Sequence, residues 1–168
     1  SFNEFIGATP DGVAPAFRFL FTFQGNLTSK TRGQLFAASF GRDDVLIERT
    51  QPFWTDTGGH AAFKQQYAEK ILQSRYVLCP RGIGTSTFRL FETMQSGRVP
   101  VILSDAWVPP AGIDWNTFSL RVPERDLARL PEICTAALPR WDAMAAEGRR
   151  VWQEWFSPAG MGKLVRTS

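Results

Sequence analysis

Residues 75–105 read RYVLCPRGIGTSTFRLFETMQSGRVPVILSD, and their pattern is the clearest guide to the architecture. The apolar run at 75–80 predicts a strand that is buried on both faces. A glycine-containing turn at 82–86 follows, and the apolar spacing over 87–96 predicts a helix. The next apolar run, 99–103, predicts a second strand. A strand, a helix and another strand in direct succession indicate a parallel crossover in an α/β fold.

The same alternation of strand and helix patterns continues on both sides of this stretch. Further strands are expected at 17–23, 45–48 and 117–122, and further helices at 31–40, 60–74, 126–137 and 139–156. Together these elements predict a Rossmann-like three-layer domain over residues 17–160, with a mostly parallel sheet of about five strands. Residues 1–16 are expected to be a linker or the end of a preceding element, and residues 161–168 a tail.

The composition narrows the class of protein. The chain has 168 residues, of which 43% are hydrophobic and 21% charged, as in a single globular domain. Its net charge of +3 includes no long basic run, so no nucleic-acid partner is expected. The two cysteines, Cys79 and Cys134, form no CxxC pair and are accompanied by one histidine, which argues against structural zinc. Whether the two cysteines form a disulfide stays open.

Several features of the turn after residue 80 suit a phosphate-bearing ligand. Ligands of open α/β sheets bind at the carboxyl ends of the strands, and the start of a helix offers N–H groups to an anion. Gly82 and Gly84 carry no side chain where a diphosphate would approach. Thr85 and Ser86 add hydroxyl groups there, although Ser86 could equally be an ordinary helix cap. The stretch matches neither a Walker A motif nor the dinucleotide fingerprint.

Two arginines, Arg81 and Arg89, flank this turn. Arginine binds phosphate through two parallel hydrogen bonds and keeps its charge. Glu92 follows Arg89 by three residues, so both lie on one face of the predicted helix. They could form a surface ion pair. Alternatively, Arg89 could bind phosphate while the carboxylate of Glu92 accepts hydrogen bonds from ribose hydroxyls.

A set of segments distributed along the chain also carries a family resemblance. In order, they are 74–82, Ser86, 89–92, Gly97, 99–105, 114–119 and 122–127. In residue type and spacing they resemble exostosin-family glycosyltransferases. The resemblance implies the C-terminal, donor-binding half of a two-domain GT-B enzyme. It also implies inverting transfer of a sugar from a nucleotide diphosphate sugar, usually a UDP-sugar, to a glycan acceptor. A helix start with two arginines can stabilise the leaving diphosphate without metal, and the sequence has no D-x-D triad, so no metal cofactor is expected.

The resemblance assigns roles to individual residues. It implies that Arg81, Ser86 and Arg89 contact the diphosphate, with Arg81 and Arg89 stabilising the leaving group, and that Glu92 holds the ribose. Asn26 and Arg32 are further donor-site candidates.

Further expectations concern Asp105, Arg98 and the acceptor-binding domain. Asp105 follows the strand at 99–103 and is expected either to touch the sugar or to cap a turn. Arg98 stands where many family members have cysteine, a departure expected to affect packing or a disulfide. The acceptor-binding N-terminal domain, which normally contributes the catalytic base, is missing from this sequence, so this piece alone could bind donor and transfer nothing.

Other readings and the cellular location stay open at this stage. The first alternative is a module that binds a nucleotide or phosphosugar without catalysis, and the second is a basic scaffold for a polyanionic glycan. The resemblance implies a membrane-anchored protein of the Golgi lumen in a eukaryote and a cytoplasmic protein in a bacterium. The sequence names neither the sugar nor the acceptor.

Overall fold

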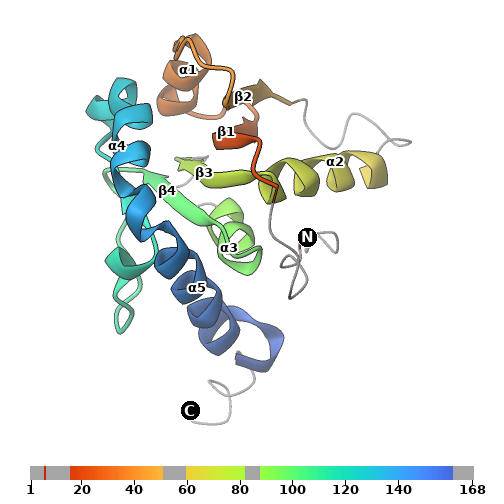
Figure 1. Cartoon of the computed structure of the whole chain (residues 1–168), viewed down its shortest axis with the longest axis vertical. Helices are drawn as coiled ribbons and strands as arrows, with labels where there is room; N and C mark the ends of the chain where they lie inside the picture. The colour runs from red at the N-terminus through yellow and green to blue at the C-terminus, as the bar shows by residue number, and fades with distance from the viewer. Residues whose placement is uncertain (1–5, 7–15, 51–59, 82–87, 161–168) are drawn as a thin grey trace.

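The computed structural model describes residues 6, 16–50, 60–81 and 88–160, which form one α/β domain (Figure 1). Its strands are β1 (Phe19–Gly25), β2 (Val45–Arg49), β3 (Ser74–Pro80), β4 (Val99–Leu103) and β5 (Leu120–Arg121). Within these ranges they form a five-stranded sheet in the order β2-β1-β3-β4-β5, with every pair parallel. The strand order therefore reverses direction between β1 and β3.

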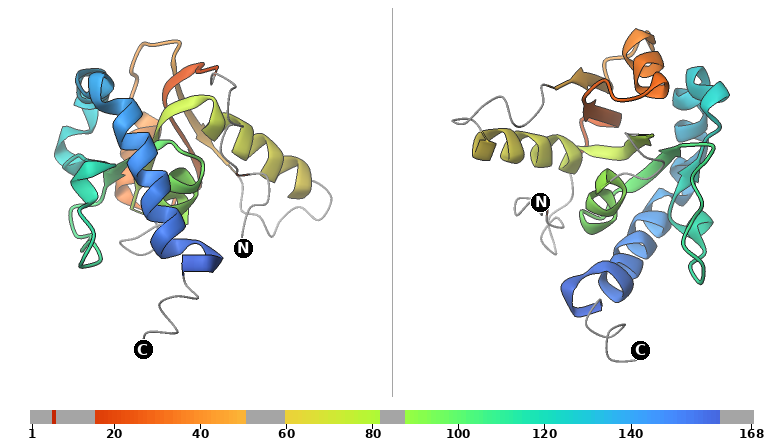
Figure 2. Two further views of the ribbon diagram at one scale, coloured as in Figure 1. Left: turned by 60° about the horizontal axis from the view of Figure 1, so that its bottom comes forward. Right: turned by 180° about the vertical axis from the view of Figure 1, so that it is seen from behind.

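Helices cover both faces of the sheet, as the alternation in the sequence predicts (Figure 2). They are α1 (Lys30–Ala37), α2 (His60–Leu72), α3 (Phe88–Gln95), α4 (Leu130–Ala137) and α5 (Trp141–Val151). Successive residues of β3 point to opposite faces and so separate the layers. Leu78 packs in the core beneath α1 and α4, whereas Val77 packs with residues of α2 and Cys79 with residues of α3. The predicted three-layer architecture is confirmed.

Helix α5 lies along the amino-terminal edge of the sheet and joins the two layers. The indole Nε1 of Trp141 donates to the carbonyl of Arg75, near the start of β3, at 2.7 Å. The Arg149 guanidinium donates to the carbonyl of Gln95, the last residue of α3, at 2.6 Å. Trp141 belongs to the core on one face and Val151 to the core on the other.

Arg98 is buried at this same edge, where its side chain joins the ends of neighbouring elements by hydrogen bonds. Its Nη2 donates to the carbonyl of Leu72, the last residue of α2, at 2.6 Å, and its Nη1 to the carbonyl of Ser96 at 3.1 Å. Its guanidinium also lies 5.1 Å from the centre of the Phe17 ring. Arg98 thus serves packing, one of the two effects expected of it.

The predicted strand at 117–122 is wrong over most of its length. Residues Trp115–Thr117 form a short 3₁₀ helix instead, and only Leu120–Arg121 pair with β4. The carboxylate of Asp114 accepts a hydrogen bond from the N–H of Asn116 at 3.3 Å. The N–H groups of Thr117 and Ser119 donate to the carbonyls of Asp114 and Trp115, at 3.2 and 3.1 Å, so these local bonds replace pairing with β4 and favour the helical turn.

The two predicted C-terminal helices, at 126–137 and 139–156, are each interrupted. The first begins as a 3₁₀ segment, Glu124–Arg129, before α4, and the second has a 3₁₀ turn, Leu138–Arg140, before α5. A π-helical turn, Trp152–Phe156, follows α5. A proline lies in the first turn of α4 and of the Leu138–Arg140 segment, where its missing N–H costs no hydrogen bond.

Two further side-chain expectations also need correction or completion. Phe88 contributes to the apolar spacing that predicts the helix at 87–96, yet this first residue of α3 is 84% exposed. Cys79 and Cys134 are both free and buried on opposite faces of the sheet, which excludes a disulfide between them. In the predicted linker, Ile6 is buried against α2. No helix of the described ranges is long and apolar enough to cross a membrane.

Candidate functional site

The reversal of strand order puts a topological switch point between the carboxyl ends of β1 and β3, the place where open α/β sheets have a ligand-binding crevice. The chain leaves β1 toward α1 on one face of the sheet and leaves β3 toward α3 on the other. Open α/β sheets bind their ligands at such a switch point. Of the candidates on the loop after β3, Arg81 is described, whereas Gly82, Gly84, Thr85 and Ser86 lie outside the described residues.

Helix α1 and the end of β3 are joined at this crevice by a compact set of hydrogen bonds. Ser29 caps α1, since its hydroxyl oxygen accepts from the N–H of Arg32 at 3.3 Å. The same hydroxyl donates to the carbonyl of Arg81 at 2.7 Å. The Arg32 side chain donates to this carbonyl at 3.1 Å and to the carbonyl of Asn26 at 3.2 Å. The three candidates Asn26, Arg32 and Arg81 are thus brought together.

Two guanidinium groups share one aromatic ring at the end of β1. The Arg89 guanidinium lies 4.7 Å from the centre of the Phe23 ring, and that of Arg32 lies 5.3 Å from it. Arg89 also donates to the carbonyl of Gln24. Burial, and then the nearby charge of Arg89, lowers the pKa of Arg32 to about 10. Positive charge is therefore concentrated in a partly dehydrated place.

Gly25, the last residue of β1, makes this approach of arginine and ring feasible. A Cβ atom at this position would lie 2.7 Å from Cζ of Phe23 and 3.1 Å from Nη2 of Arg89. Both distances are shorter than normal contacts between these atoms. A larger residue would push the ring or the guanidinium out of place, so glycine is required here for space.

Glu92 is half-buried and is bonded to α2, so it is not simply one half of a surface ion pair. Its Oε2 accepts a hydrogen bond from the hydroxyl of Tyr67 at 2.8 Å. Burial raises the pKa of the Glu92 carboxyl, while the Tyr67 hydrogen bond and the charge of Arg89 oppose that rise. The Arg89 guanidinium lies 6.0 Å from the centre of the Tyr67 ring. Arg89, Glu92 and Tyr67 therefore form one cluster.

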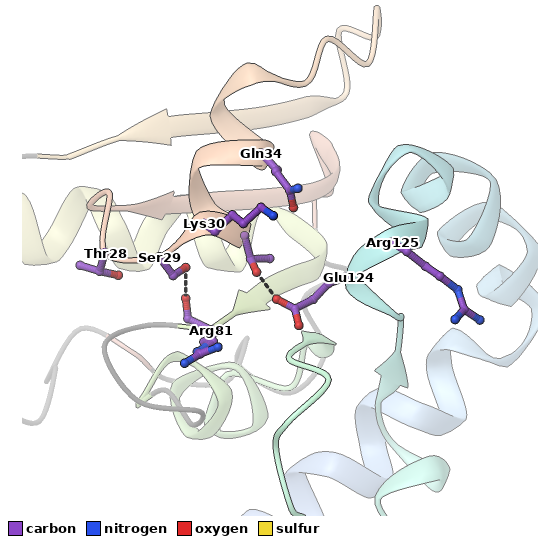
Figure 3. A pocket seen from close by; sticks show the side chains of 8 residues that line it. Thr28, Ser29, Lys30, Gln34, Arg81, Glu124 and Arg125 are labelled. Atoms are coloured by element: carbon purple, nitrogen blue, oxygen red, sulfur yellow. Dashed lines mark hydrogen bonds between the residues drawn. The ribbon is translucent and has the colours of Figure 1, made fainter.

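A pocket of about 470 Å³ opens beside the start of α1 (Figure 3). It is lined by Thr28, Ser29, Lys30, Thr31, Gln34, Arg81, Glu124 and Arg125. Its lining includes three cationic side chains and one carboxylate, at a place where the first turn of α1 adds a partial positive charge. This composition favours an anionic ligand.

Glu124 and Asp105 form a reciprocal clasp at the border of this pocket. The N–H of Asp105 donates to Oε2 of Glu124 at 3.1 Å, and the N–H of Glu124 donates to Oδ1 of Asp105 at 3.0 Å. The Thr31 hydroxyl donates to the other carboxylate oxygen of Glu124, which Figure 3 shows pointing toward α1. The Asp105 carboxylate thus holds the first residue of the 3₁₀ segment Glu124–Arg129, and contact of Asp105 with a sugar stays a prediction.

Several side chains of this region were not among the sequence candidates. Ser29 precedes a helical pattern, and that position is a recognisable cap signal. Tyr67 belongs to the apolar stripe of α2, so periodicity alone classes it as a core residue. Glu124 reaches α1 across 93 residues of sequence, and no local pattern predicts such a contact.

Comparison with known proteins shows which family this chain resembles. The chain matches the family described as the Exostosin GT47 domain over residues 7–137. It is 31% identical to Exostosin-1 of Drosophila melanogaster over 169 residues, covering 90% of this chain and 22% of that protein. It is 33% identical to a probable glycosyltransferase of Arabidopsis thaliana over 143 residues, covering 83% of this chain and 25% of that protein.

A solved structure extends the comparison to the fold. The C-terminal domain of a glycosyl transferase group 1 family protein, LpcC of Francisella tularensis, superposes with a TM-score of 0.56 at 12% identity. The superposition covers 93% of this chain and 98% of that domain, as expected of one half of a GT-B fold. The chain spans about a quarter of the length of the curated relatives named above. Because the family match extends over most of its residues, the chain belongs to the exostosin GT47 family of glycosyltransferases.

Proposed function

We propose that this chain binds a nucleoside diphosphate sugar, specifically a UDP-sugar, in the crevice between β1 and β3. In the whole protein it would be the donor-binding half of an inverting glycosyltransferase. The observation that carries the proposal is the pair of guanidinium groups of Arg32 and Arg89 around the Phe23 ring. Arg32 is buried and Arg89 is half-buried, so their like charges repel each other, and a bound diphosphate would relieve that repulsion for both.

The surroundings of the two arginines suit the same ligand. Arg81 and Lys30 line the adjoining pocket at the start of α1. Guanidinium groups hold phosphate oxygens through paired hydrogen bonds, and helix starts add a favourable potential for an anion. A diphosphate in the crevice would thus meet positive charge from the α1 side and from the α3 side.

The position of Glu92 suits a ribose next to that diphosphate. Glu92 follows Arg89 by three residues, which is a rise of about 4.5 Å along a helix. Phosphate and ribose are neighbouring parts of a nucleotide, so one face of α3 could contact both. An ionised carboxylate accepts hydrogen bonds from the two hydroxyls of a ribose.

The proposed reaction follows from where charge develops. The oxygen of an acceptor hydroxyl forms a bond to the anomeric carbon of the sugar while the bond from that carbon to the diphosphate oxygen breaks. The electron pair of the broken bond remains on the diphosphate, and Arg81 and Arg89 would stabilise the charge that builds there. The hydroxyl proton passes to a base that we assign to the acceptor-binding domain. A single displacement of this kind inverts the anomeric configuration.

Calorimetric titration of the 168-residue chain tests the donor-binding step. We expect saturable binding of UDP, weaker binding of GDP and no saturable binding of a heparin-like polymer. Arg89→Gln is expected to weaken UDP binding roughly a hundredfold. Arg150→Gln is the matched control, because Arg150 lies on α5 and pairs with Glu147 and Glu154. Failure of the wild-type chain to bind any nucleoside diphosphate, or unchanged binding by Arg89→Gln, would contradict the proposal.

Sugar transfer itself requires a longer protein that includes the acceptor-binding domain. In that protein, Arg89→Gln is expected to lower the rate of transfer from a UDP-sugar, whereas Arg150→Gln leaves it unchanged. Donor binding without transfer in the longer protein would favour the alternative of a non-catalytic binding module.

A further inference from the structure

We propose that Tyr67 is a positioning residue of the nucleotide site, which orients the Glu92 carboxylate so that it discriminates ribose from sugars that lack the 2′- and 3′-hydroxyls. This inference rests on the proposed function, since it assigns Glu92 to the ribose. Tyr67 itself would not touch the nucleotide. Its hydroxyl would hold one oxygen of the carboxylate and thereby direct the other toward the ribose.

The contacts of Tyr67 tie three elements together around the crevice. Its hydroxyl donates to Oε2 of Glu92 on α3 at 2.8 Å. Its backbone carbonyl accepts from the side chain of Gln24 on β1 at 3.4 Å. The carbonyl of Gln24 in turn accepts from Arg89. The Tyr67 hydroxyl is therefore held in place from α2, β1 and α3 together.

A fixed carboxylate is what recognition of two hydroxyls requires. A glutamate side chain has several rotatable bonds, and freezing them when ligand binds costs conformational entropy. The hydrogen bond from Tyr67 removes part of that freedom before the nucleotide arrives. It also opposes the effect of burial on the pKa of Glu92 and so favours the ionised form, which accepts hydrogen bonds from both hydroxyls.

The chain supplies a matched control in its second tyrosine. Tyr76 lies on β3, in the core beneath α1 and α4, on the other side of the sheet from Tyr67. Its hydroxyl is buried, and among the described residues it has no hydrogen-bond partner. Tyr76→Phe therefore removes a buried tyrosine hydroxyl without changing the cluster of Tyr67, Arg89 and Glu92.

The experiment compares the affinities of the 168-residue chain for UDP and for 2′,3′-dideoxy-UDP by calorimetry. We expect Tyr67→Phe to weaken UDP binding about fivefold, the usual effect of losing one hydrogen bond, and to leave 2′,3′-dideoxy-UDP binding unchanged. Tyr76→Phe should leave both affinities as in the wild type. In a Glu92→Gln background, which lacks the carboxylate, Tyr67→Phe should not further change the ratio of the affinity for UDP to the affinity for 2′,3′-dideoxy-UDP.

A fluorine measurement avoids dependence on the Tyr67→Phe protein. Incorporation of 3-fluorotyrosine into the Tyr76→Phe chain gives one fluorine resonance, from Tyr67. UDP should shift this resonance, and 2′,3′-dideoxy-UDP should leave it in place. Equal shifts with both nucleotides, or equal loss of both affinities in Tyr67→Phe, would overturn the inference and leave Tyr67 a structural residue. If the wild-type chain binds no nucleoside diphosphate, the proposed function itself fails.

Discussion

Buried arginines lie at both edges of the sheet, and their neighbours differ. Arg98, at the amino-terminal edge, and Arg32, at the carboxyl edge, both have a pKa lowered to about 10. Burial alone accounts for the lowered pKa of Arg98, whereas Arg32 is also affected by the charge of Arg89. Arg98 donates to carbonyls at the ends of helices, for example that of Leu72.

The difference teaches that burial of an arginine does not by itself indicate a ligand site. In a parallel α/β sheet, helices end at the amino-terminal edge and present carbonyl groups there, which accept hydrogen bonds from a cation. At the carboxyl edge helices begin, and their N–H groups add to the positive potential. A second guanidinium strengthens it further. The carboxyl edge is therefore the place where a bound anion would gain most.

The strongest way to test this contrast is to neutralise one arginine at the carboxyl edge. Arg89→Gln is expected to cost about 3 kcal/mol of UDP binding, or roughly a hundredfold in affinity, because a charge that faces the diphosphate is lost. Calorimetry measures the affinity. Arg89→Gln also loses the hydrogen bond to the Gln24 carbonyl, but relief of the repulsion with Arg32 offsets that loss, so the ligand-free protein should melt close to the wild type. If Arg89→Gln instead lowered the melting temperature and kept the affinity for UDP, Arg89 would be a structural residue and the carboxyl edge would not be the ligand site.

The converse substitution at the amino-terminal edge should affect stability instead. Arg98→Met is expected to lower the free energy of unfolding by about 2 kcal/mol, since the buried carbonyl of Ser96 and the partly buried carbonyl of Leu72 lose their donor. Urea denaturation measures this loss. UDP affinity of the folded protein should equal that of the wild type, and a tenfold loss of affinity would show that the two edges are coupled.

A smaller, pH-dependent effect on stability is expected from the carboxylate of Glu92. Tyr67 and Arg89 face Glu92, and burial raises its pKa above the ordinary 4.5. A carboxyl whose pKa is higher in the folded state stabilises the fold at low pH, and that contribution is lost as the pH rises through the folded pKa. Glu92→Gln should therefore raise the melting temperature at neutral pH, and the gain should shrink below pH 4.5. An equal gain at both pH values would contradict this account.

The smallest effect is expected from the rim of the pocket. Lys30 is an exposed residue that lines the pocket at the start of α1. Solvent and salt screen such a charge, so Lys30→Gln should weaken UDP binding only about threefold. Titrations at low and high salt should show that this difference disappears at high salt. A loss as large as that in Arg89→Gln would place the diphosphate in the outer pocket rather than in the crevice.

Much of the architecture could be predicted from local patterns. Apolar runs indicated the strands at the centre of the sheet, and helical spacing of apolar residues indicated the helices between them. Strand β4 was predicted with its observed bounds. The failures lay where local hydrogen bonds compete with periodicity, as at Asp114, or at the exposed first residue of a helix, as with Phe88. Strand ends were nevertheless located well enough to suggest Arg81 and Asp105 as residues near one edge, whereas Asn26 came from the family resemblance.

The arrangement of these residues around the crevice depends on the order of the strands, which no local pattern contains. Because β1 and β3 are neighbours, Ser29 reaches the carbonyl of Arg81 across 52 residues of sequence, and Arg89 reaches that of Gln24 across 65. The partnership of Tyr67 with Glu92 arises in the same way. Periodicity reports which face of its own element a residue occupies, whereas its neighbours from other elements follow from packing of the whole domain. The sequence therefore supplied the class of fold and most candidate residues, and the folded domain determined their partners and their charge environment.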